Sequence, residues 1–382
     1  MKKSIYLDYA AATPMHPLVT KAMERYLSDR FHNPSAQYLA GKQVAADLSK
    51  AREEVAHWLG ARPSEVVFTA GGSEANNLAI SGVMQQFAGA NIVVSAIEHE
   101  AVLAPASQYK VHLAKVQQDG VIDLAALEAC IDDKTVLVSV MYANNEIGTI
   151  QPLKEISSIV AEVRKARSRS GNKLPIYLHT DACQAAAWLD LHVHKLGVDL
   201  MTINAGKIYG PKQCGALFVK TGTKLKPQIL GGGQEQGRRS GTENVAGIVG
   251  FAKALDLVQS DRHKESARVK ALQADFIALL TTATIANVKV NGSLRQRLPN
   301  NIHITIPDQD NERLMMQLDE FGIQCAVGSA CSASSDLPSH VLKAIGLSDA
   351  EAQASLRFSM GVATSQKDVE TTVKTLASIL RA

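Results

Sequence analysis

Short apolar runs with few charges alternate with longer segments of helical spacing over the first two thirds of the chain. The runs in which we expect strands are Glu65–Thr69, Asn91–Ser95, Val136–Val140, Pro175–Leu178, Asp199–Ile203 and Gly215–Val219. Parallel strands that helices cover on both faces have this apolar character, because neither face meets water. The pattern therefore predicts an α/β fold around a mostly parallel sheet.

Two segments between these runs have the spacing of helices. Glu74–Gln86 follows the first strand, and Gly41–Gly60 precedes it. In the second segment, the apolar residues that share one helical face are Val44, Leu48, Val55 and Leu59. We expect this helix to end at Gly60, since glycine readily adopts the conformation that ends a helix.

The pattern changes near residue 255. Asp256–Leu280 is a long helical segment rich in Lys, Arg, Gln and Ala. The strands expected after it are shorter, namely Val288–Val290, Ile302–Ile306 and Ser355–Ser359, and a final helix is expected at Gln366–Leu380. This part of the chain predicts a second, smaller α/β domain.

Composition and charge exclude several classes of protein. Of the 382 residues, 46% are hydrophobic, so the chain can bury a large core and is not globally disordered. A net charge of +3 is too small to indicate nucleic acid or an anionic membrane as the main partner. No apolar stretch approaches the roughly 18 residues of a membrane span, and no signal peptide is expected. The charge run Arg164–Lys173 is expected to be a solvated helix end and loop, with a binding patch as the alternative.

The cysteines are odd in number and have no paired spacing, which argues against a disulfide framework. They are Cys130, Cys183, Cys214, Cys325 and Cys331. Without a C-x2-C pair we expect no metal site, and a reducing, cytoplasmic location is the default. Cys331 stands apart because the run of small residues around it is typical of an accessible thiol; a buried structural cysteine is the alternative.

Polar residues that suit cofactor chemistry follow the expected strands. Lys207 precedes a Gly-Pro turn, where a lysine can form a Schiff base with an aldehyde; a solvated loop lysine is the alternative. Asp181 follows another strand, at the edge where open α/β sheets bind ligands. A carboxylate there can keep a pyridine nitrogen protonated, and Gln184 can donate to a ring oxygen. A turn with a helix cap is the alternative for this segment.

Two glycine-containing segments suit anion binding. Thr69–Glu74 joins a strand to a helix, where backbone amides and a hydroxyl form a phosphate cradle. Its glycine spacing fits neither a Walker A motif nor a dinucleotide fingerprint, and a plain helix start is the alternative. Gly231–Asn244 combines glycines with arginines, as in an anion-binding loop or a flexible surface loop.

The remaining candidates also follow or lie in expected strands. His99 can stack on a ring and transfer protons, with a capping or surface histidine as the alternative. Asn144–Glu146 follows the next strand, and Arg357 can hold a carboxylate through two hydrogen bonds. A Schiff-base lysine, a carboxylate for a pyridine nitrogen, a phosphate cradle and a carboxylate-binding arginine are together what a pyridoxal phosphate (PLP) enzyme needs.

In this combination the chain resembles the cysteine desulfurases, the NifS/IscS-like branch of the class V aminotransferase enzymes, nearly end to end. The segments that carry the resemblance are Tyr6–Pro14, Asn33–Ser35, Glu98–His99, Asn144–Gly148, Asp181–Gln184, Lys207–Pro211, Arg239–Thr242, Gly328–Cys331 and Arg357–Gly361. The resemblance implies a PLP fold of type I, with a mostly parallel seven-stranded sheet in a large domain, 15–258. A small α/β domain, 1–14 and 259–382, would carry the catalytic cysteine.

The resemblance also implies site residues and partners. The cofactor contacts expected are Lys207, Gly72, Ser73, His99, Asn145, Asp181, Gln184, Asn204, Gly206 and, across a homodimer, the partner subunit's Thr242. The contacts expected with the substrate, L-cysteine, are Asn145, Arg357 and Asn33. The catalytic residues would be Lys207, His99 and Cys331. Cys331 would take the sulfur as a persulfide and pass it to an acceptor protein, for iron–sulfur cluster assembly or for tRNA or cofactor thiolation.

One position departs from the family pattern. The family usually has a histidine immediately before the lysine, whereas this chain has Gly206, and Gln213 stands where the family prefers glycine. Because a lost hydrogen bond to a charged group costs about 1.5–3 kcal/mol, weaker cofactor retention is expected. Another aminotransferase, a selenocysteine lyase and a sulfur-relay protein without cofactor chemistry are the alternative functions. The presence of Lys207, Asp181 and Gln184 argues against the last of these.

Overall fold

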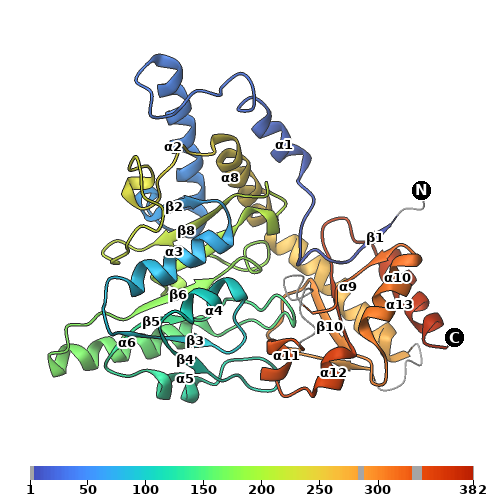
Figure 1. Ribbon diagram of the computed structural model, residues 1–382. Coiled ribbons are helices and arrows are strands. Elements are labelled where there is room, and N and C mark those ends of the chain that lie inside the picture. Colours follow the sequence, from blue (N-terminus) through green and yellow to red (C-terminus); the bar gives the residue numbers. More distant parts are fainter. Residues whose placement is uncertain (1–3, 283–287, 329–337, 382) are drawn as a thin grey trace.

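The computed structural model describes residues 4–282, 288–328 and 338–381. Figure 1 shows a large sheet with helices around it and a smaller α/β part formed mainly by C-terminal residues. The large sheet has seven strands in the order β2-β8-β7-β6-β5-β3-β4. The strands are β2 Val66–Thr69, β3 Asn91–Ser95, β4 Lys110–Ala114, β5 Thr135–Ser139, β6 Tyr177–Asp181, β7 Leu200–Asn204 and β8 Gly215–Val219. Strand β8 runs in the opposite direction to the other six strands of this sheet, so the expected mostly parallel α/β sheet is confirmed.

Helices cover both faces of this sheet. Val67 of β2 packs into a core with α3 and α4, whereas Val66 and Phe68 pack into the other core with α2, α6 and α8. The helices are α1 Pro17–Glu24, α2 Leu39–Leu59, α3 Gly72–Met84, α4 Glu100–Ala106, α5 Leu124–Cys130, α6 Leu153–Ser170, α7 Val193–Leu196 and α8 Val245–Ser260. Helix α2 ends at Gly60 in the left-handed conformation, as predicted.

The smaller part has its own sheet, in which β10 pairs antiparallel with β9 and β12. Its strands are β9 Lys289–Val290, β10 Asn301–Thr305 and β12 Ser355–Ser359, and its helices are α9 Arg262–Thr282, α10 Asn311–Glu320, α11 His340–Ala344, α12 Asp349–Gln353 and α13 Gln366–Ile379. Near the N-terminus, β1 Ile5–Tyr6 pairs with β11 Ile323–Gln324. Because this pairing joins the N-terminal residues to the smaller part, it supports the proposed division into a large domain, 15–258, and a small domain, 1–14 and 259–382. Across the described ranges, no helix is long and apolar enough to cross a membrane.

Three expectations about elements were wrong. The edge strand β4 was missed because its sequence, KVHLA, is half exposed and is not an apolar run. Strand β6 lies later than expected and includes His179, because its buried imidazole hydrogen-bonds Ser139 and Thr202 of the neighbouring strands. The single helix expected at 256–280 is two helices, α8 and α9, which meet at Asp261.

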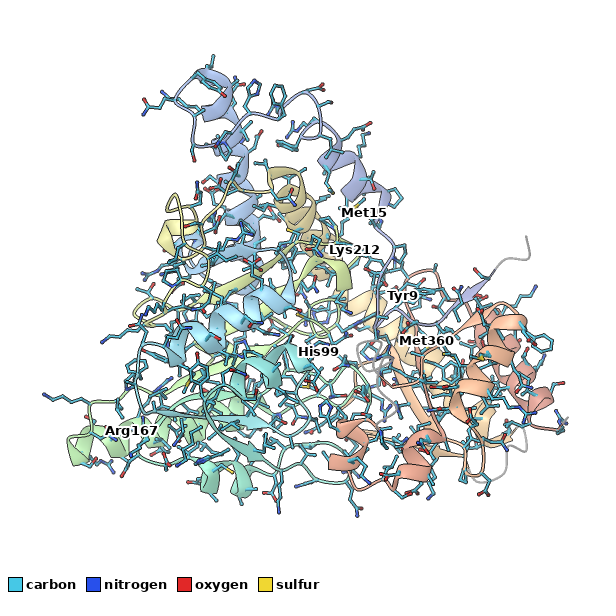
Figure 2. All side chains as sticks on the ribbon, in the orientation of Figure 1. Tyr9, Met15, His99, Arg167, Lys212 and Met360 are labelled. Atoms are coloured by element: carbon cyan, nitrogen blue, oxygen red, sulfur yellow. The ribbon has the colours of Figure 1, made fainter. Side chains whose placement is uncertain are left out.

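The charge run at the end of α6 is less solvated than expected. Arg167 is buried and donates hydrogen bonds to backbone carbonyl groups of Asp132, Thr135, Leu174 and Pro175. Arg164 forms an ion pair with Asp199. Figure 2 labels Arg167 in the green helix, far from the site described next. These two arginines therefore fix the end of the helix to the sheet, and the expectation of a solvated run holds for the other charges alone.

Candidate active site

A cavity of about 230 Å3 lies at the carboxyl edge of the large sheet. The structure brings together there most of the site residues predicted from the sequence, namely Gly72, Ser73, His99, Asn145, Asp181, Gln184, Asn204, Lys207 and Arg357. The lining that sequence reasoning missed includes Ala10, Ala11, Asn76, Met141 and Cys183. Asp181 and Asn204 are the last residues of two adjacent strands, β6 and β7, which explains why segments distant in sequence meet here.

Lys207 lies in a short turn that begins directly after β7. The Asn204 side chain starts this turn by accepting a hydrogen bond from the backbone N–H of Gly206, at 3.0 Å. The Lys207 Nζ donates to the carbonyl oxygens of Ala10 and Ala11, at 2.8 and 2.6 Å. The N-terminal segment therefore crosses the cavity and holds the lysine from the other side.

Asp181 is buried at the base of the cavity, where two donors fix its carboxylate. Its Oδ2 accepts from the Asn76 Nδ2 at 2.6 Å, and its Oδ1 accepts from the backbone N–H of Cys183 at 2.9 Å. Asn76 is itself buried, in the second turn of α3. The orientation of the carboxylate is thus fixed by one helix and by the loop after its own strand.

A second carboxyl group, that of Glu98, lies close enough to Asp181 to interact with it electrostatically. Glu98 is fully buried, and its Oε1 accepts from the backbone N–H of Met141. Burial first, and the nearby Asp181 carboxylate to a smaller extent, hold the pKa of Glu98 well above its usual range, although the hydrogen bond from Met141 acts in the opposite direction. Glu98 therefore stays neutral in a pH range where an exposed glutamate is ionised.

His99 begins helix α4 and caps it. Its Nδ1 accepts from the backbone N–H of Ala101 at 3.0 Å, so the neutral imidazole carries its proton on Nε2. Figure 2 shows His99 near the middle of the molecule, close to where the large and small parts meet. Capping was the alternative role expected for this residue. His99 caps the helix and also lines the cavity. The side chain can thus offer an N–H donor to a ligand.

Arg357 reaches the same cavity from strand β12 of the smaller part. The side chain is buried, and its two terminal nitrogens donate to the Asn145 carbonyl oxygen at 3.1 Å and to the Asp8 carboxylate at 2.7 Å. Within the described part of the chain, the buried Nε has no hydrogen-bond partner. A guanidinium held in this way retains donors for the carboxylate of a ligand.

The comparisons with known proteins decide the family. The model of the family described as "Aminotransferase class-V" matches residues 5–372. The chain belongs to the class V aminotransferase family. A protein named cysteine desulfurase IscS from Dictyoglomus turgidum is 40% identical to it, over 100% of this chain and 95% of the relative. Another, cysteine desulfurase IscS 1 from Archaeoglobus fulgidus, is 38% identical over 98% of this chain and 96% of the relative.

Solved structures agree with this assignment. A NifS-like protein has a TM-score of 0.90 and 30% identity, with 99% of this chain and 100% of that chain covered. A structure described as SspA in complex with cysteine has a TM-score of 0.80 and 34% identity, with 94% of this chain and 99% of that chain covered. The expected PLP fold of type I and the resemblance to the cysteine desulfurases are therefore confirmed.

The residues of this aminotransferase-family chain fit PLP at the start of helix α3. Its first N–H groups have no acceptor inside the helix, and its cap residue, Gly71, has no side chain to occupy them. A Cβ at position 72 would come within 2.8 Å of the Cys183 Sγ, so the close packing here requires glycine. A phosphate suits these donors, and Lys207, Asp181 and Gln184 are placed around the same cavity.

Some predicted site residues do not line this cavity in the single chain. Asn33 and Thr242 are exposed, and the Asn33 Oδ1 accepts from the backbone N–H of Ser35. Gly206 lines a neighbouring cavity. Cys331 lies outside the described residues. Among the residues that are described, no cluster of His, Cys, Asp and Glu could hold a metal ion.

The arginines of the glycine-rich loop have protein partners. Arg239 donates to the Glu74 carboxylate at 2.9 Å, and Arg238 donates to the carbonyl oxygen of Ser64. Glu235 of the same loop is buried and pairs with Arg52 at 2.6 Å. These contacts fasten the loop to the large part of the molecule, which accounts for its arginines without a bound anion.

Proposed function

We propose that the protein is a PLP-dependent cysteine desulfurase, which converts L-cysteine to L-alanine and leaves the sulfur as a persulfide on Cys331. The observation that carries the proposal is that Lys207, Asp181 and Arg357 line one cavity, although they come from separate parts of the sequence. The relatives named cysteine desulfurase, similar over the whole chain, support the same reaction.

The cofactor would be held by residues already in place. Lys207 would bind its aldehyde carbon, Asp181 its pyridine nitrogen and Gln184 its ring oxygen. Gly72, Ser73 and Asn204 would contact its phosphate. When bound, PLP supplies an electron sink for the charge that develops at the substrate Cα. The two donors on the Asp181 carboxylate keep it oriented for this task.

Other side chains around the cavity bind the substrate and transfer protons. Arg357, fixed by Asp8, binds the substrate carboxylate. The amine of Lys207 takes the proton from the substrate Cα, as a general base held near the reacting carbon. The Nε2–H of His99 is the nitrogen left for the ligand, because Nδ1 is engaged with the helix backbone.

Cys331 would complete the reaction from a segment beyond the described residues. Its thiolate attacks the substrate sulfur; the new S–S bond forms as the C–S bond breaks, and the carbon keeps the electron pair and takes a proton. The flanking residues support this role. Ala326, before the segment, is paired with Arg357, and His340, after it, hydrogen-bonds the Glu98 carbonyl oxygen at 2.8 Å.

A homodimer is part of the proposal. Leu27, Phe31 and Leu39, between α1 and the start of α2, are each at least 70% exposed, and a second copy of this chain would cover them. Thr242, which is exposed in the single chain, would then reach the cavity as the partner subunit's Thr242. The persulfide would pass to an acceptor protein of iron–sulfur cluster assembly or of tRNA or cofactor thiolation.

A Cys331→Ala variant tests the proposal. It should become yellow with PLP and should still change its absorbance when L-cysteine is added, because the cofactor site is intact. It should release no sulfide in the presence of a reductant. A Cys130→Ala variant is the matched control, since Cys130 is half-buried at the end of helix α5 and does not line the cavity, and should release sulfide normally. Undiminished sulfide from the Cys331→Ala protein would overturn the assignment of the acceptor thiol.

A further inference from the structure

A second cavity, of about 450 Å3, lies at the start of helix α3 beside the first. Both cavities are lined by Gly72, Ser73, Asn204 and Lys207, and the second is also lined by Lys212. Lys212 follows the glycine–proline turn after Lys207, and no role was expected for it from the sequence. Figure 2 labels it in the upper middle of the molecule.

The aliphatic part of Lys212 lies over Gly206. A Cβ at position 206 would come 3.2 Å from the Lys212 Cδ, which is tighter than ordinary van der Waals contact. The Lys212 Nζ donates to the carbonyl oxygen of Thr13, and Thr13 is in turn bonded to the carbonyl oxygen of Gly206. Because position 206 has no side chain, the aliphatic part of Lys212 can lie across the turn.

The charges around this cavity favour an anion. In the described lining, Lys207 and Lys212 are the cationic side chains and Glu74 is the acidic one. The Glu74 carboxylate is bound by Arg239 at 2.9 Å and by the backbone N–H of Ala70 at 2.9 Å. Since attachment to an aldehyde occupies the nitrogen of Lys207, Lys212 is the ammonium group that stays available here. One of its three donors is used by Thr13, and two remain without a partner among the described residues.

We propose that Lys212 binds the phosphate of PLP and supplies the contact that Gly206, without a side chain, does not make. The proposal rests on the function proposed above, because it assumes that PLP occupies the cavity. It also changes the expectation that the cofactor is retained more weakly. Lys212, five residues beyond Lys207, replaces the hydrogen bond that a side chain at position 206 would make.

Titrations of the full-length apoprotein with PLP and with pyridoxal, which lacks the phosphate, test this role without an activity assay. For Lys212→Ala, the dissociation constant for PLP should rise about tenfold, the lower end for a hydrogen bond to a charged group, because Lys212 is exposed. The dissociation constant for pyridoxal should not change. Lys50→Ala, which removes an exposed charge from helix α2, should leave both constants unchanged.

The outcomes separate the proposals. Equal weakening of PLP and pyridoxal binding would mean that Lys212 supports the fold through Thr13, and unchanged PLP binding would mean that it makes no phosphate contact; either result overturns the inference. A wild-type apoprotein that binds neither ligand would instead overturn the proposed function itself.

Discussion

Replacing Glu98 by glutamine tests whether this buried carboxyl group beside the active site is neutral in the folded protein. Glu98 is fully buried, and across the described residues its Oε2 has no hydrogen-bond partner. Burial raises its pKa well above the ordinary value of 4.5. As the pH rises above 4.5, the unfolded chain releases this proton while the folded chain retains it. The free energy of unfolding therefore falls with pH until the pKa in the folded state is reached.

The size of the effect follows from this linkage. One pH unit corresponds to about 1.4 kcal/mol for a single proton. Glutamine has the shape of the neutral acid and no proton to release, so the Glu98→Gln protein should gain about 1.4 kcal/mol relative to wild type for each pH unit above 4.5. The gain ends where the folded wild type begins to ionise.

Denaturant unfolding of the two apoproteins at a series of pH values and one protein concentration measures this difference. The matched control is Glu128→Gln, an exposed glutamate at the end of α5, which should keep the pH dependence of the wild type. A difference between wild type and Glu98→Gln that stays constant with pH, or that favours the wild type as the pH rises, would refute the claim that Glu98 is neutral in the fold.

Three further variants test the cavity. Asn76→Ala removes a buried donor to the Asp181 carboxylate and should weaken PLP binding about tenfold or more in an apoprotein titration; unchanged binding would contradict the positioning role. Arg357→Lys keeps the charge but loses the planar fork, so KM for L-cysteine should rise at least about tenfold in a steady-state alanine assay, and an unaltered KM would count against substrate binding. Gly72→Ala places a Cβ 2.8 Å from the Cys183 Sγ and should impair PLP binding, which a second change, Cys183→Ala, should partly restore; no restoration would show that another contact is limiting.

The sequence predicted the fold where the physical signal was local. Strands β2, β3, β5 and β8 are mostly apolar runs because they are buried on both faces, and these were located within a few residues. Strand β4 lacks that signal because it is half exposed, whereas β2, at the other edge of the sheet, is fully buried. The break at Asp261 was hidden because the residues on both sides of it favour helices.

The site was predictable where side chains carry the chemistry. Lys207, Asp181 and Arg357 stand out by residue type and by position: Asp181 ends a strand, Lys207 follows one shortly after its end, and Arg357 lies within one. Asn76 was missed because it lies inside a helix, where the neighbouring Ser73, Glu74 and Asn77 are polar as well. Ala10 contributes a backbone carbonyl oxygen, which no side-chain pattern reveals.

The central claim is that this chain removes sulfur from L-cysteine with PLP. The most direct measurement is the alanine formed from L-cysteine by the PLP-loaded protein with a reductant present, with sulfide counted in parallel. The account predicts alanine and sulfide in equal amounts, and neither product from a Lys207→Ala protein. A yellow, PLP-loaded protein that forms no alanine would contradict it.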